Sequence, residues 1–127
     1  MDCVTIGDSI AVGIGRASHC YQMAAIGRTA FDQAALIKPI NIDTAIISLG
    51  TNRPTDPNLN VDLVYVRTNV KANKVVWIIP YNKDAAKIVR SVAASFGDKY
   101  VELSAFPTSD DLHPNKYGAV AKQALKD

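Results

Sequence analysis

Residues 44–52 have the sequence TAIISLGTN, an almost wholly apolar run followed by a glycine and two polar residues. Residues 75–80, VVWIIP, form a second apolar run, which ends at a proline. Short runs without alternating polar residues are typical of strands that are covered on both faces of a parallel sheet. Two parallel strands need a crossover between them, and a helix is the usual one. These two segments therefore predict an α/β fold.

Three weaker segments extend the pattern. Residues 3–6, 21–26 and 100–103 are shorter or more mixed apolar stretches that suit further strands. The resulting order, βαβαβαβαβα, predicts an open five-stranded parallel sheet with helices on both faces. We expect the whole chain, residues 1–127, to form one domain of this three-layer α/β/α type.

The helices between the strands are indicated by apolar side chains at helical spacing. Residues 83–96 show this spacing, with Asn82 as a candidate cap and Gly97 as a candidate stop. Residues 60–70 fit either a strand or a helix, and the need for a crossover favours the helix. Pro114 stands where a last helix could begin. Lone Trp77 is expected in the core.

Composition excludes several classes of protein. The 127 residues are 48% hydrophobic and 20% charged, which suits a globular chain, and the net charge is only +2. Such a charge predicts neither a nucleic-acid partner nor binding to an anionic membrane. No apolar run approaches the ~18 residues of a membrane-spanning helix, and no signal peptide is recognised. We therefore expect a cytoplasmic protein, or one delivered without its own signal, for instance within a viral particle.

The cysteines and histidines do not form a metal-binding pattern. His19 adjoins Cys20, and His113 stands far along the chain. Cys3 and Cys20 could lie on neighbouring strands, so a disulfide and two reduced thiols are both open. The lack of a secretory signal favours two packed, reduced thiols.

Functional sites of open parallel sheets form beyond the carboxyl ends of the strands. Four of the five predicted strands are followed by small or polar residues there. These are Gly7-Asp8-Ser9, Gly27-Arg28-Thr29, Gly50-Thr51-Asn52 and the segment Ser109-Asp110-Asp111-Leu112-His113-Pro114. The sequence therefore predicts that these four segments meet at one edge of the sheet.

The chemistry that this set could perform is acyl transfer. A serine hydroxyl such as Ser9 needs a base to take its proton, and His113 is the candidate. Asp110, three residues earlier, could orient the imidazole and balance its charge. The candidate donors for an oxyanion are the backbone N–H groups of Ser9 and Gly27 and the side-chain amide of Asn52.

The four segments, in this order, resemble the motifs of the SGNH hydrolases, also called the GDSL esterase/lipase family. GDS near the N-terminus, a glycine after the second strand, GTN after the third and D-x-x-H-P near the C-terminus carry the resemblance. The resemblance implies a flavodoxin-like sandwich with strand order 2-1-3-4-5. It also implies Ser9 as nucleophile, His113 as base, Asp110 as its partner, and Gly27 and Asn52 in the oxyanion hole. The family needs no cofactor and no metal.

The sequence departs from the family's pattern at several points. The chain is short, which leaves little room for a lid, and Arg53 follows Asn52 where an aspartate is common. Asp111 is a rival for the role of Asp110. The roles of Arg28 and Tyr81 stay open, as does that of Arg53. Gly13 and Gly15 have the wrong spacing for a dinucleotide fingerprint.

From the residues and the resemblance, we expect an esterase that hydrolyses small acyl esters, such as acetyl esters on a glycan or another small molecule. The absence of room for a lid predicts a preference for short acyl groups. The alternative is a non-catalytic carbohydrate-binding or structural module that keeps the fold. The sequence leaves the oligomeric state and the natural ester undetermined.

Overall fold

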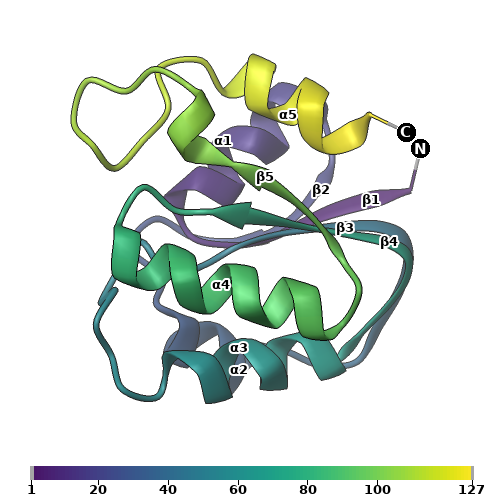
Figure 1. Ribbon diagram of the computed structural model, residues 1–127. Coiled ribbons are helices and arrows are strands. Elements are labelled where there is room, and N and C mark those ends of the chain that lie inside the picture. Colours follow the sequence, from purple (N-terminus) through teal and green to yellow (C-terminus); the bar gives the residue numbers. More distant parts are fainter. Residues whose placement is uncertain (1, 127) are drawn as a thin grey trace.

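The computed structural model describes residues 2–126, in which strands and helices alternate along the chain (Figure 1). The strands are β1 (Cys3–Gly7), β2 (Tyr21–Ala24), β3 (Ile40–Ser48), β4 (Val70–Ile79) and β5 (Lys99–Glu102). The helices are α1 (Ser9–Ser18), α2 (Ala30–Leu36), α3 (Leu59–Thr68), α4 (Lys83–Ser95) and α5 (Tyr117–Leu125), with a single 3₁₀ turn at Leu103–Ala105.

The five strands form one parallel sheet in the order β2-β1-β3-β4-β5. Helices α1 and α5 cover one face of the sheet, while α2, α3 and α4 cover the other (Figure 1). The predicted fold class and strand order are thus confirmed. All loops that follow the strands lie at the same edge of this sheet, as parallel pairing requires.

Each face of the sheet has its own apolar core. The face under α2, α3 and α4 contains Leu63 and Trp77, both fully buried, and the face under α1 and α5 contains Ile10 and Ile46. Trp77 lies in the core as predicted, although its indole N–H also donates a 2.9 Å hydrogen bond to Asp98. That bond meets the need of a buried indole for an acceptor.

The two central strands are longer than the apolar runs that predicted them. β3 begins at Ile40 and β4 at Val70, several residues before residues 44 and 75. The extra residues alternate between more and less exposed positions and continue the parallel pairing, from Ile40 opposite Val70 onward. The apolar runs mark only the part of each strand that helices cover on both faces.

The predicted helix start at Pro114 is wrong. Pro114 instead forms an isolated antiparallel bridge with Thr108, and α5 begins at Tyr117. The bridge is held by a backbone hydrogen bond from Asn115 N–H to Pro107 O at 2.9 Å. Pro114 therefore helps to close the segment 107–115 into a narrow loop.

The favoured reduced state of the cysteines is also wrong, because Cys3 and Cys20 form a disulfide. Cys3 opens β1, and Cys20 precedes β2, so the bridge joins two neighbouring strands around helix α1. Both cysteines are nearly buried. The pattern of strands already allowed this pairing, and the reduced state was favoured only because no secretory signal was recognised.

Among residues 2–126, none of the helices combines the length and the apolar character needed to span a bilayer.

We expect the disulfide to stabilise the fold appreciably. The disulfide closes a loop with a sequence separation of 17 residues. In the chain-entropy model, a disulfide that closes a loop of this length raises the free energy of unfolding by about 3 kcal/mol. A Cys3→Ala/Cys20→Ala double variant should lose a free energy of unfolding of this order, measured by urea denaturation. Wild type in excess reductant should shift in the same direction; an unchanged midpoint in both would contradict the expectation.

Candidate active site

The ends of β1 and β3 lie in close contact at Gly7. Its φ of +136° lies in the region that favours glycine, and a Cβ there would stand 1.8 Å from the Ser48 carbonyl oxygen. The next N–H, that of Asp8, donates to the same oxygen at 3.0 Å. Only glycine therefore allows the chain to turn from β1 into α1 so close to β3.

Asp8 is the N-cap of the helix that follows, α1. One carboxylate oxygen, Oδ1, accepts hydrogen bonds from the N–H groups of Ile10 and Ala11 and from the hydroxyl of Ser48. The other oxygen, Oδ2, is buried without a partner among residues 2–126. Burial raises the pKa of Asp8 from 3.8 to about 6, although the hydrogen bonds oppose this change.

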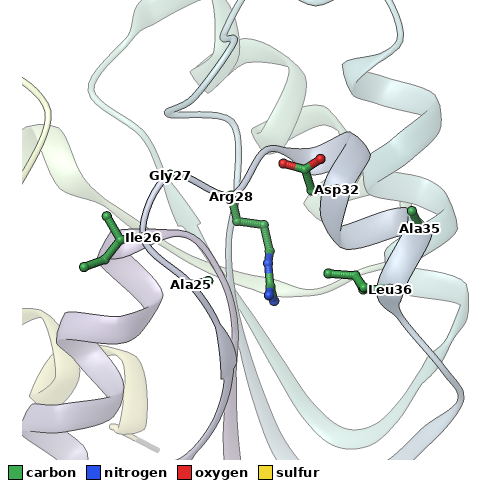
Figure 2. Close-up of a pocket in the computed structure, with 7 residues that line it drawn as sticks. All are labelled: Ala25, Ile26, Gly27, Arg28, Asp32, Ala35 and Leu36. Atoms are coloured by element: carbon green, nitrogen blue, oxygen red, sulfur yellow. The ribbon is translucent and has the colours of Figure 1, made fainter.

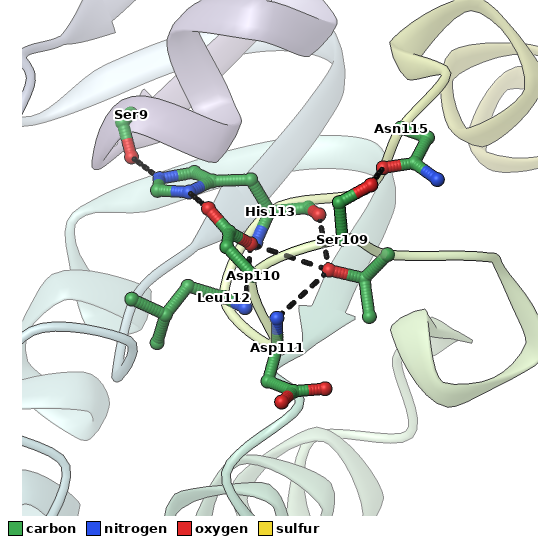
Figure 3. A network of polar contacts seen from close by, with 8 residues as sticks. Ser9, Ser109, Asp110, Asp111, Leu112, His113 and Asn115 are labelled. Carbon is green, nitrogen blue, oxygen red and sulfur yellow. Dashed lines mark hydrogen bonds and ion pairs between the residues drawn. The ribbon is translucent and has the colours of Figure 1, made fainter.

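Ser9 is the first residue of α1, and its N–H takes no part in the cap that Asp8 forms. Its Oγ lies 2.9 Å from Nε2 of His113, although 104 residues separate the two in sequence. Figure 3 shows the imidazole lying between Ser9 and Asp110. The structure thus brings the two ends of the predicted site together.

Asp110 holds the other side of the imidazole. Its Oδ2 lies 2.8 Å from Nδ1 of His113, and its Oδ1 accepts the backbone N–H groups of Leu112 and His113 at 2.9 and 2.7 Å. The hydrogen bond with the imidazole, followed by the two backbone N–H groups, holds the pKa of Asp110 well below its usual range. Asp111, the rival, makes no contact with the imidazole and has a left-handed backbone with φ of 60°.

Thr108 is a contributor that the sequence analysis missed. Its hydroxyl lies 2.6 Å from the carbonyl oxygen of His113 and accepts the N–H of Asp111 at 3.1 Å. It therefore ties the start of the loop to the residue that carries the imidazole. Its place three residues before Asp111 is the spacing of a hydroxyl that closes a turn, which is the only signal that could have found it.

The second and third predicted segments are tied to each other. Nδ2 of Asn52 donates to the carbonyl oxygen of Arg28 at 3.1 Å, next to Gly27. Gly27 and Gly50 have φ values of +81° and +105°, so each loop turns at its glycine. Within residues 2–126, no hydrogen bond links Gly27 or Asn52 to Ser9 or His113. Both remain candidate donors, placed on loops at the carboxyl ends of their strands.

Several residues that the sequence analysis left open have structural contacts. The Tyr81 hydroxyl donates to the carbonyl oxygen of Phe106 at 3.0 Å and so ties the end of β4 to the segment after β5. Gly13 lies against the ring of Tyr117, where a Cβ would stand 2.5 Å from a ring atom. A side chain at Gly13 would therefore separate α1 from α5.

The described part of the chain, residues 2–126, contains no group of three or more His, Cys, Asp or Glu side chains that could hold a metal ion. The chemistry available at this edge of the sheet is that of a hydroxyl, an imidazole, a carboxylate and N–H donors.

We expect the buried Asp8 to make stability depend on pH. Because its pKa is about 6 in the folded chain against 3.8 ordinarily, folding binds a proton between these values, and the free energy of unfolding falls as pH rises through that window. The change amounts to about 3 kcal/mol. The Asp8→Asn variant should therefore gain stability relative to wild type by this order between pH 4 and pH 7.5, measured by urea denaturation. The exposed control Asp111→Asn should show no such gain, and a parallel pH profile for wild type and Asp8→Asn would contradict the assignment.

Comparison with known proteins finds neither a matching family model nor a matching curated protein sequence. Solved structures are similar in fold. A carbohydrate acetylesterase from Sinorhizobium meliloti is 12% identical with a TM-score of 0.59, over 95% of this chain and 96% of that one. A member of the lipolytic G-D-S-L family from Veillonella parvula is 13% identical with a TM-score of 0.58, over 97% and 96%. An aryl esterase from M. smegmatis is 13% identical with a TM-score of 0.61, over 95% and 96%. The resemblance to the SGNH hydrolases thus extends to the fold, and this chain shares the architecture of GDSL-type esterases over nearly its whole length.

Proposed function

We propose that this protein is a small serine esterase of the SGNH type, in which Ser9, His113 and Asp110 form the catalytic triad. The observation that carries the proposal is the unbroken series of contacts from Ser9 Oγ through the imidazole to Asp110, at 2.9 and 2.8 Å. Both distances lie within hydrogen-bond reach, as a nucleophile and its base require. These contacts lie at a half-exposed surface, so the hydrophobic core does not require them.

The proposed reaction follows from these contacts. With Nδ1–H of His113 donating to Asp110, Nε2 is free to accept the proton of Ser9. The serine oxygen then attacks the ester carbonyl, and the proton passes from Nε2 to the departing alcohol as the carbon–oxygen bond of the ester breaks. Water, losing its own proton to Nε2, then attacks the acyl-enzyme and releases the acid and the free serine. The carboxylate of Asp110 stabilises the imidazolium that forms in both steps, acylation and deacylation.

The negative charge on the carbonyl oxygen needs donors in the transition state. The N–H of Ser9, at the N-terminus of α1, is the first candidate, because the helix dipole also favours negative charge there. The N–H of Gly27 and the side chain of Asn52 are the others. Asn52 has two amide hydrogens, and donation to Arg28 O uses one of them. The second is therefore free for a substrate oxygen.

For the substrate, we propose a short acyl ester such as an acetyl ester. In residues 2–126 the longest loops at this edge run from 49 to 58 and from 106 to 116, and neither contains a helix or strand that could form a lid over an acyl chain. The names of two similar structures, a carbohydrate acetylesterase and an aryl esterase, are consistent with esters of this size. An ester with a long acyl chain, such as p-nitrophenyl palmitate, should be a poor substrate beside p-nitrophenyl acetate.

Ser9→Ala tests the nucleophile. Wild type should hydrolyse p-nitrophenyl acetate and form a covalent adduct with a fluorophosphonate, detected by mass spectrometry, because an activated serine is the group that such probes modify. Ser9→Ala should do neither, while its far-UV spectrum and melting temperature stay close to wild type. A non-catalytic carbohydrate-binding or structural module would give no turnover and no adduct in wild type. That result would overturn the proposal.

The acid of the triad can be tested with a matched pair of variants. Asp110→Ala should lower kcat much more than Asp111→Ala, because only Asp110 contacts the imidazole. His113→Ala should lower kcat by at least about 10³-fold, as removal of a triad member usually does. Steady-state kinetics on p-nitrophenyl acetate measure all three. A larger loss in Asp111→Ala than in Asp110→Ala would reassign the acid.

A further inference from the structure

Two arginines of this chain have purely structural partners. Arg67 donates two hydrogen bonds to the carboxylate of Asp98, and Arg90 donates two to that of Glu102. Such bidentate ion pairs match the donor geometry of the guanidinium and balance its charge within the protein. The charge of each of these two arginines is therefore balanced by a carboxylate of the protein itself.

Arg28 is held differently, by neutral groups. Its Nη1 donates to the side-chain oxygen of Gln33 at 3.0 Å and to the carbonyl oxygen of Met23 at 3.4 Å. Gln33 is a buried polar residue, 1% exposed, in helix α2. No carboxylate of residues 2–126 forms an ion pair with Arg28. The side chain is therefore oriented, yet its positive charge is not balanced.

Arg28 lines a pocket of about 400 Å³ (Figure 2), a volume in the range of small-ligand sites. The pocket also contains Ile26 and Leu36, two large apolar side chains that are 77% and 57% exposed. Figure 2 shows the side chain of Arg28 extending toward Leu36, with Ala25 beside it. The pocket thus offers apolar walls and one cation, which suits a ligand with an apolar body and a negative charge.

Asp32 lines the same pocket but does not neutralise Arg28. Its carboxylate accepts the N–H of Thr29 at 3.2 Å as part of the cap of α2. In Figure 2 it points away from the guanidinium of Arg28. Carboxylates in the first turn of a helix commonly accept backbone N–H groups in this way.

The pocket is joined to the candidate active site through one short loop. Gly27, whose N–H is a candidate oxyanion donor, lines the pocket directly. The next carbonyl group, that of Arg28, accepts the amide of Asn52. A substrate whose carbonyl group met these donors would therefore place one of its two halves next to the pocket.

We propose that this pocket, the Arg28 pocket, binds a carboxylate group of the ester substrate, so that the enzyme prefers esters that carry a negative charge. The proposal rests on the proposed esterase function and adds the substrate class. The carboxylate would accept the N–H groups of Arg28 that the protein leaves unused, and the apolar part of the ligand would contact Ile26 and Leu36. The charge could belong to the acyl half or to the alcohol half of the ester.

Two pairs of esters distinguish these halves. The mono-4-nitrophenyl ester of succinic acid against 4-nitrophenyl butyrate tests a carboxylate in the acyl half. 4-Acetoxybenzoate against its methyl ester tests a carboxylate in the alcohol half. For wild type we expect kcat/KM to favour the anionic member of one pair, once each value is corrected for the uncatalysed rate, and the preference to weaken as salt is added.

Arg28→Gln and Arg53→Gln form the matched variants. Arg53 follows Asn52 on the neighbouring loop, is exposed and does not line the pocket, so its loss removes the same net charge. Arg28→Gln should lower the anionic-to-neutral ratio of kcat/KM by about 10-fold, mainly through KM. Arg53→Gln should leave the ratio as in wild type. A role of Arg28 in holding the loop alone would lower both members of a pair together and leave the ratio unchanged, which would overturn the proposal.

A binding experiment separates this inference from the proposed function. Ser9→Ala should bind 4-acetoxybenzoate saturably, with amide shifts in the NMR spectrum at residues 25–36, and the Ser9→Ala/Arg28→Gln double variant should not. If wild type hydrolyses none of the four esters, the esterase proposal fails. The titration then still decides whether the pocket binds a carboxylate. If hydrolysis is normal but neither anionic ester is preferred, the Arg28 pocket proposal fails while the esterase proposal stands.

Discussion

The contact between the ends of β1 and β3 is the constraint on which the candidate site depends. Gly7 turns against the carbonyl group of Ser48, the N–H of Asp8 donates to that group, and the hydroxyl of Ser48 donates back to the carboxylate of Asp8. Because the sheet positions both strands, these contacts determine where the first turn of α1 begins. Ser9 is thereby presented at the sheet edge as a consequence of packing in the central strands.

The rest of the site is organised in a second, independent unit. The loop 107–115 is closed by its own hydrogen bonds: Thr108 and Asn115 donate to carbonyl groups of the loop, and Asp110 accepts the N–H of His113. His113 is therefore oriented by its sequence neighbours and not by Ser9. The contact between the loop and α1 then aligns the imidazole with the Ser9 hydroxyl. One feature of this arrangement opposes stability, since Asp8 leaves a carboxylate oxygen buried without a partner. Such costs are common where a structure serves a site more than it serves the fold.

The fold could be predicted because its signals are local. Apolar runs marked the covered parts of β3 and β4, and the polar residues after them marked the sheet edge on which the candidate triad lies. The rest depended on contacts between distant residues. Ser48 acts through a hydroxyl group whose partner, Asp8, lies in another segment, and no spacing of residue types identifies it. Thr108 acts within its own loop, where only the spacing of a turn-closing hydroxyl indicates it. Pro114 was misassigned since proline suits a strand-like bridge as well as a helix start. The state of Cys3 and Cys20 was misassigned because it was inferred from the lack of a secretory signal and not from the neighbouring strands.

The disulfide has a consequence for the motions of the sheet. β2 is a four-residue edge strand in which only Tyr21 and Gln22 are exposed, and such strands separate from their neighbours more readily than central ones. The covalent link to β1 removes this independence, because β2 cannot leave the sheet without displacing the strand that leads into the serine. The disulfide thus couples the edge of the sheet covalently to the strand that leads into Ser9.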